Sequence, residues 1–154
     1  MKKTILLLAS VVLLFSCNKP DEQEQTTPTT SNSVIVKKWK LYKKYNNGTE
    51  STNGDMEYWD FKSDYKLIRD FIYADTTILP NATYTDTWSL ANNDSELRIK
   101  LDRWIPTNNG TDSIHMQGYE IHSVLKLSAD TLILEEDLSD EDYTMIVKRI
   151  LIPN

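Results

Sequence analysis

The feature that most constrains the fold is the period of the apolar residues, which is two across nearly all of residues 34–154. This alternation is typical of half-buried β-strands, and polar turns rich in Asn, Gly, Asp and Ser interrupt it at short intervals. No long segment has helical periodicity. We therefore predict an all-β domain whose eight strands lie near residues 34–45, 56–62, 65–73, 83–91, 95–104, 113–127, 131–136 and 142–152.

Short connections predict that strands adjacent in the sequence are antiparallel neighbours. An eight-stranded meander closes most simply as an antiparallel up-and-down barrel, because closure removes the exposed edges of the sheet. A two-sheet β-sandwich is the alternative, since eight short strands are compatible with both. Residues 34–154 are enough for one domain.

A signal peptide is predicted over residues 1–16, where Lys2 and Lys3 precede an apolar run. The run ends in Leu-Phe-Ser-Cys, which resembles a bacterial lipobox, and Cys17 is the only cysteine of the chain. The resemblance implies that Cys17 becomes the amino terminus of a lipoprotein and is acylated with palmitate-type chains that hold it in a membrane. A plain secretory peptide is the alternative.

Residues 17–33 are predicted to be the lipidated cysteine and a disordered tether, because residues 18–33 are polar and nearly free of apolar side chains. Asp21 and Glu22 follow the anchor closely, in a pattern that resembles the export signal of Bacteroidetes lipoproteins. That signal directs lipoproteins of the outer membrane to the cell surface. An ordinary tether, with the domain facing the periplasm, is the alternative.

The charge balance excludes nucleic acid as a partner. The chain has 17 basic and 23 acidic side chains, and loss of Lys2 and Lys3 with the signal peptide leaves 15 basic ones, for a net charge of about −8. Nucleic-acid binding depends on Lys and Arg that neutralise phosphates. With Cys17 acylated, no cysteine is left for a disulfide or a metal site.

No motif for catalysis or for a cofactor is found, so we predict a protein that is not an enzyme and has neither cofactor nor metal. A Gly-rich phosphate loop, a two-histidine helix motif and a nucleophile elbow are all absent from the sequence. Gly118 lies between His115 and His122, and a glycine within a strand suggests a β-bulge. The bulge would place both histidines on the outer face, and without it they would lie on opposite faces.

Short motifs spread over residues 34–154 resemble the small lipocalin-like lipoproteins of Bacteroidetes. They are Trp39-Lys40-Leu41, Trp59-Asp60-Phe61-Lys62-Ser63-Asp64-Tyr65, Thr87-Trp88-Ser89-Leu90, Leu97-Arg98-Ile99 and the two strands from Ile121 to Leu134. The resemblance implies an eight-stranded barrel with a ligand cavity.

Lipocalins also close one end of the barrel with a tryptophan of the first strand beneath a basic residue from near the end of the chain. Trp39 and Arg149 match these two positions, with Lys148 as the rival of Arg149. The resemblance therefore implies a barrel-closing pair, with the Arg149 guanidinium within about 6 Å of the Trp39 ring.

Alternation along the strands also predicts which side chains line a ligand pocket. The candidates are Trp39, Trp59, Phe61, Arg69, Phe71, Tyr84, Asp86 and Trp88. A buried guanidinium must be paired, and Asp86 on the next strand is the expected partner of Arg69. A hairpin centred near residues 77–78 would set the two opposite each other, whereas a flipped third strand would leave Arg69 in solvent.

Two other strands have predicted inward faces. The first strand is expected to turn Ile35, Trp39, Leu41 and Tyr45 inward. Beyond the bulge at Gly118, the sixth strand is expected to turn Tyr119, Ile121, Leu125 and Leu127 inward.

Two function classes follow from this interior. The first is a binding module for a small apolar or amphipathic ligand, with Arg69 holding an acidic head group. The second is an interaction or accessory protein of the envelope with a filled barrel that acts through its loops. An open pocket of several hundred cubic ångströms, on the order of known ligand sites, would favour the first. An interior closed by Trp39, Trp59, Phe71 and Trp88 would favour the second.

Overall fold

A computed structural model describes residues 30–52, 54–77, 80–106 and 113–154. The signal peptide and the lipidation of Cys17 concern residues outside this range. The elements in chain order are α1 (Thr30–Ile35), β1 (Lys38–Asn46), β2 (Thr49–Glu50), β3 (Met56–Phe61), β4 (Lys66–Ile72), β5 (Ala82–Ala91), β6 (Glu96–Pro106), β7 (Ser113–Leu127), β8 (Leu132–Asp137) and β9 (Ile146–Pro153).

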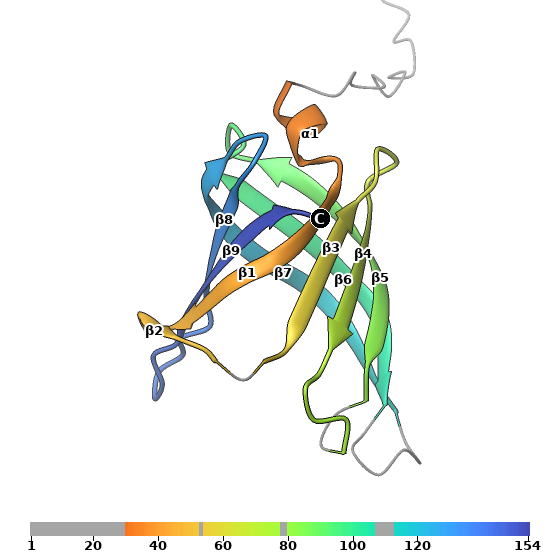
Figure 1. The fold of residues 1–154 in the computed structure, drawn as a ribbon, viewed down its shortest axis with the longest axis vertical. Coiled ribbons are helices and arrows are strands. Elements are labelled where there is room, and N and C mark those ends of the chain that lie inside the picture. The colour runs from red at the N-terminus through yellow and green to blue at the C-terminus, as the bar shows by residue number, and fades with distance from the viewer. Residues whose placement is uncertain (1–29, 53, 78–79, 107–112) are drawn as a thin grey trace, which may run out of the picture.

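The predicted up-and-down barrel is confirmed. The strands lie in one sheet in the order β2-β1-β3-β4-β5-β6-β7-β8-β9, and the additional pairing of β1 with β9 closes it (Figure 1). Every pairing is antiparallel, and β2 is only a two-residue extension beside the end of β1. Closure leaves the eight long strands without a free edge, which is the usual protection of an all-β domain against edge-to-edge association.

The chain enters the barrel through α1, which the sequence did not predict. Val34, Ile35 and Val36 are β-branched and therefore suggested a strand, but Ile35 ends the helix and is fully buried. The carbonyl oxygen of Ile35 accepts a hydrogen bond from Trp39 Nε1 at 2.8 Å, which fixes the helix against the first strand. The helix begins at Thr30, so it also extends into the segment expected to be a tether.

An irregularity in β1 changes which side chains of its second half face inward. The register against β9 shifts between Leu41 and Lys43. As a result Lys44 lies opposite Arg149, and its Nζ is 3.5 Å from Glu57 Oε1 inside the barrel. The prediction that Tyr45 faces inward is therefore wrong, because the extra residue reverses the alternation.

The predicted inward face of β7 is wrong at Tyr119, Ile121 and Leu125 and right at Leu127, which packs against the apolar core beyond the register shift. Its ladder with β6 runs without a shift from Ser113 to Ser123, and the irregularity lies further on, between Val124 and Lys126. Gly118 therefore causes no change of face. Tyr119, Ile121 and Leu125 are exposed on the outside, and Glu120, His122 and Val124 face inward.

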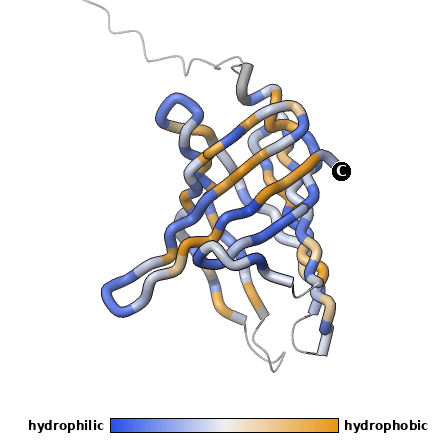
Figure 2. Tube along the Cα trace, turned by 60° about the vertical axis from the view of Figure 1, so that its left-hand side comes forward, coloured by the Kyte–Doolittle hydropathy of each residue, from blue (hydrophilic) through white to orange (hydrophobic). Residues whose placement is uncertain are grey.

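The barrel has two different ends. At one end α1 covers the interior, and at the other the hairpins β4–β5, β6–β7 and β8–β9 turn; we call this second end the mouth (Figure 1). Apolar residues follow the barrel wall and hydrophilic residues gather at the hairpin turns (Figure 2). Within the described residues, no helix has the length and apolar character that crossing a membrane requires.

The apolar core fills the half of the interior beneath α1, which we call the apolar half. Its members are Ile35, Trp39, Trp59, Phe61, Leu67, Trp88, Leu97, Ile99, Leu101, Leu132, Leu134 and Leu151. Phe61 packs edge-on against Trp88, with ring centroids 5.3 Å apart. These strand positions are the ones that the period of two predicts.

Candidate functional site

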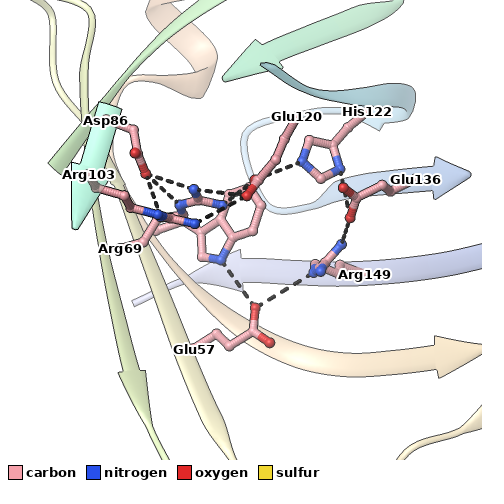
Figure 3. Close-up of polar contacts among 9 residues, drawn as sticks. Glu57, Arg69, Asp86, Arg103, Glu120, His122, Glu136 and Arg149 are labelled. Atoms are coloured by element: carbon pink, nitrogen blue, oxygen red, sulfur yellow. Dashed lines mark hydrogen bonds and ion pairs between the residues drawn. The ribbon is translucent and has the colours of Figure 1, made fainter. Parts of the chain in front are cut away.

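Toward the mouth, the inward positions of seven strands become charged or polar. Together they form what we call the charged layer, and its members are Glu57, Arg69, Asp86, Arg103, Glu120, His122, Glu136 and Arg149 (Figure 3). The side chains come from β3 to β9, so no local segment of the sequence contains the site. The indole of Trp59 lies beneath the layer, at the boundary with the apolar half.

Arg69 is the most heavily paired residue of the layer. Its Nη2 and Nε donate to Asp86 Oδ2 at 2.7 and 3.0 Å, and its Nη1 and Nη2 donate to Glu120. The predicted inward position and the pairing with Asp86 are confirmed. The register is not as predicted, because Arg69 lies opposite Tyr84 and Asp86 opposite Leu67, so the pair is diagonal.

Arg103 is a second cation of the layer, and the sequence prediction missed it. Its Nη1 donates to Asp86 Oδ2 at 3.0 Å and its Nη2 to Glu120 Oε1 at 3.3 Å. The guanidinium lies over the ring of Tyr84, 4.3 Å from the centroid. A signal was present, since Arg103 continues the alternation of Leu97, Ile99 and Leu101 on β6.

Arg69 and His122 keep Glu120 ionised. Burial alone would raise the pKa of this carboxyl, but the facing His122 ring and the charge and hydrogen bonds of Arg69 outweigh burial and lower the pKa to about 2. Burial would likewise lower the pKa of Arg69, yet Glu120 and Asp86 raise it above the usual value of arginine. Glu120 and Arg69 therefore form an ion pair across the physiological range of pH.

His122 is at the centre of the layer and is completely buried. Its Nε2 lies 3.7 Å from Glu120 Oε2, and its Nδ1 lies 3.8 Å from Glu136 Oε2. Neither nitrogen has a hydrogen-bond partner among the described residues, although both point at a carboxylate. The arrangement with both histidines on the outer face is therefore wrong, and the alternative with His115 and His122 on opposite faces holds, because the ladder of β7 is unbroken. His115 is exposed as expected and pairs with Asp102 at 2.8 Å.

Arg149 completes the layer on the side of β9. Its Nη1 donates to Glu136 Oε2 at 3.0 Å, and its Nε lies 3.6 Å from Glu57 Oε2. Its guanidinium lies over Trp59, 5.7 Å from the ring centroid.

The predicted pair of Trp39 and Arg149 is wrong. Trp39 lies opposite Pro153 on β9, whereas Arg149 lies opposite Lys44, nearer the mouth. The cation over the Trp39 ring is instead Lys37, 5.1 Å from the centroid. Trp39 is fully buried at the α1 end, and the cation over its ring comes from two residues earlier in the chain and not from the last strand.

Comparison with solved structures identifies the architecture. A lipocalin-like protein from Bacteroides uniformis superposes with a TM-score of 0.52 and 20% sequence identity, covering 79% of this chain and 99% of its own. The fold is lipocalin-like. No protein-family model matches the sequence, and no curated protein matches it either.

The lipocalin-like barrel separates the predicted pocket residues into two groups. Trp39, Trp59, Phe61 and Trp88 are buried in the apolar half or at its boundary. Phe71 and Tyr84 are partly exposed on the mouth side of the layer, with ring centroids 5.7 Å apart. Whether any of these residues contacts a ligand stays a prediction.

The mouth of the lipocalin-like barrel combines apolar and charged surface. Ile114 and Met116 share the inward face of β7 with Glu120, but lie nearer the mouth and are exposed. On the opposite wall, a groove of about 270 Å³ is lined by residues of β1–β3, among them Lys44 and Glu57. The layer is therefore reached from the mouth, where Glu120 is its most exposed member, with 21% of its side-chain area accessible.

Proposed function

We propose that this chain is a lipid-anchored, non-enzymatic binding protein of the bacterial envelope. Its lipocalin-like barrel takes a small amphipathic ligand through the mouth. The main support for this proposal is the order in which surfaces of different character follow one another from the mouth into the barrel. Exposed Ile114 and Met116 come first, partly exposed Phe71 and Tyr84 follow, and the charged layer lies behind them.

The polar end of such a ligand is expected to meet Arg103 and Arg149 rather than Arg69. All three nitrogens of the Arg69 guanidinium already donate to Asp86 or Glu120, and its side chain is only 3% exposed. In contrast, the Nε atoms of Arg103 and Arg149 have no hydrogen-bond partner within the described residues. An unpaired buried donor is costly, so a ligand group that accepts from it gains affinity.

Native mass spectrometry of the protein purified from its own host tests the binding function. We expect a small molecule that stays bound under native conditions and is released by denaturant. Ile114→Asp should abolish its retention, because a carboxylate in the mouth repels the apolar part of the ligand. Ile121→Asp, the same change on the outer face of β7, is the control and should retain it. Equal occupancy in both variants, or no bound molecule in the wild type, would contradict the proposal.

The anchor is tested separately. Cys17 follows a lipobox-like segment, and the described chain begins with α1 at the end of the barrel opposite the mouth (Figure 1). An anchor that precedes α1 therefore leaves the mouth free to face away from the membrane. We expect Cys17→Ala to prevent incorporation of labelled palmitate and to remove the protein from the outer-membrane fraction. A variant that still labels and still fractionates with this membrane would contradict the anchor.

An interaction role is the second candidate, and the outer face of the β6–β7 hairpin favours it. Trp104, Tyr119, Ile121 and Leu125 are each more than half exposed there. A large exposed apolar surface on a monomer often marks a contact with another molecule. If this face binds an envelope protein, Ile121→Asp should reduce co-purification of that protein and Ile114→Asp should not, which is the reverse of the result expected for the ligand.

A further inference from the structure

Three side chains of the charged layer have the composition of a metal site. One ring nitrogen of His122 and one carboxylate oxygen each from Glu120 and Glu136 lie within 4.8 Å of one another. His122 is fully buried and points its two nitrogens at these two carboxylates, yet makes no hydrogen bond among the described residues. A buried imidazole without a partner, aimed between two carboxylates, requires an explanation.

We propose that Glu120, His122 and Glu136 bind a divalent transition-metal ion of the Zn²⁺ class inside the barrel. Imidazole nitrogen and carboxylate oxygen are ordinary Zn²⁺ ligands at about 2.0–2.2 Å. Ca²⁺ and Mg²⁺ are disfavoured because they prefer oxygen ligands throughout. This inference is independent of the proposed ligand, since the metal would occupy the layer whether or not the mouth takes an amphipathic molecule.

One ion would bind only one ring nitrogen of His122, because the two nitrogens of an imidazole point in diverging directions and face different carboxylates. The separations of 3.7 Å from His122 Nε2 to Glu120 Oε2 and 3.8 Å from Nδ1 to Glu136 Oε2 are too long for hydrogen bonds. Two ligands of one tetrahedral Zn²⁺ lie about 3.4 Å apart, given bond lengths of about 2.1 Å. The three ligand atoms lie within 4.8 Å of one another, so the most distant pair would approach by up to about 1.4 Å on binding, through rotation of the glutamate side chains.

The carboxylate oxygens that face His122, Glu120 Oε2 and Glu136 Oε2, already accept from Arg69 and Arg149, and each has a second lone pair with which it could bind an ion. Arg69 and Arg103 hold Glu120, and Arg149 holds Glu136. In protein metal sites the ligating carboxylates are themselves hydrogen-bonded by outer residues that orient them. The three guanidiniums are in the position of such outer residues.

The cations of the layer are unevenly distributed over its carboxylates. Its four carboxylates, Glu57, Asp86, Glu120 and Glu136, face three guanidiniums and the ammonium of Lys44, which contacts Glu57 alone among these acids. The His122 ring lies between Glu120 and Glu136, and a metal ion bound there would add positive charge at these two carboxylates.

Titration of the full chain with Zn²⁺, followed by calorimetry, tests the site. A Cys17→Ala background removes the thiol that would compete for the metal. We expect one ion per chain, and His122→Gln should weaken its affinity by at least the 10–100-fold that loss of an outer-shell partner typically costs. His115→Gln is the matched control, because it removes the only other histidine and should change the affinity by less than about twofold.

A measurement on the chain with both histidines intact covers the case in which His122→Gln does not fold. In ¹⁵N-histidine NMR, Zn²⁺ should shift the ring nitrogens of His122 and leave those of His115 in place. Loss of binding in His115→Gln, a shift confined to His115, or no binding at millimolar Zn²⁺ would each overturn the metal site.

Discussion

The same strands line the apolar half and the charged layer, yet the inward side chains of these two regions differ in chemical character. Seven strands change from apolar to charged or polar at nearly the same height as they run toward the mouth. The changes are Trp59 to Glu57, Leu67 to Arg69, Trp88 to Asp86, Leu101 to Arg103, Val124 to His122, Leu134 to Glu136 and Leu151 to Arg149. Because strands that are distant in the sequence change character at the same height, their charged and polar side chains form one continuous layer.

The comparison indicates that the apolar half contributes most of the stability of the fold. Burial of apolar side chains stabilises the α1 end and depends little on exact partners. Buried ion pairs contribute little net stability even when they are complete, because desolvation offsets the attraction between the charges. The charged layer therefore has no advantage over an apolar filling as a source of stability, and its presence fits the binding role proposed for the mouth.

The largest expected effect is in the apolar half. Trp39→Ala removes a fully buried indole and its hydrogen bond to Ile35. We expect the free energy of unfolding to fall by about 5 kcal/mol, the upper end of the range for such truncations. Urea denaturation followed by circular dichroism measures the loss. A loss below about 1 kcal/mol would mean that α1 and Trp39 do not close the barrel.

Breaking the charged layer should cost somewhat less. Arg69→Met leaves Asp86 and Glu120 buried with only Arg103 as a guanidinium partner. We expect a loss of about 3 kcal/mol in the free energy of unfolding, the lower end for a broken buried pair because Arg103 remains. Arg98→Met, on the exposed face of β6, is the control and should be near neutral. Similar losses in the two variants would remove the distinction between the layer and the surface.

The pH dependence of stability sharpens the comparison further. The pKa of Glu120 is about 2 in the folded protein and 4.5 in the reference state, so its ionised form favours folding. This stabilisation is present above pH 4.5 and is lost as the pH falls toward 2. It amounts to about 3 kcal/mol at 1.36 kcal/mol per pKa unit.

Glu120→Gln should remove that contribution. Thermal unfolding between pH 2 and 6 should therefore show a shallower acid loss in this variant than in the wild type. Glu135→Gln lies on the outer face of the neighbouring β8, and its curve should follow the wild type. Parallel curves for Glu120→Gln and the wild type would show that the layer does not hold Glu120 ionised.

The smallest effect is expected outside the barrel. Ile121→Ser changes an outer residue of β7 that is 52% exposed, so its stability should stay within about 0.5 kcal/mol of the wild type. A loss of about 2 kcal/mol or more, typical of a buried aliphatic side chain, would instead mean that this face is covered.

The sequence alone predicted the architecture because the apolar half repeats with a period of two. Trp59, Phe61 and Trp88 were placed correctly by alternation. The partner of Arg69 was also predicted correctly, because alternation places Asp86 on the inward face of the next strand. Local rules suffice where each inward residue is apolar or has its partner one strand away.

The same rules failed where distant strands decide the outcome. On β7, the apolar residues Tyr119, Ile121 and Leu125 were predicted to face inward, but they lie on the outer face. Glu120 and His122 are stabilised inside by residues of β4, β6 and β8, which no local pattern reveals. A bulge in β1 and the short α1 were missed because both are set by packing against other elements and not by local propensity.

The seam between β1 and β9 has a consequence for the order of folding. Asn47 Oδ1 accepts a hydrogen bond from the backbone N–H of Ile146, a residue 99 positions later in the chain. Pairings across such a distance have a large loop-closure entropy and slow the folding rate. Because the chain is synthesised from its amino end, β1 is formed first and stays without this partner until β9 is complete. During that interval the arginines and glutamates of the interior are hydrated. Pairing of β1 with β9 therefore closes the barrel and at the same time removes water from the eight polar side chains of the charged layer.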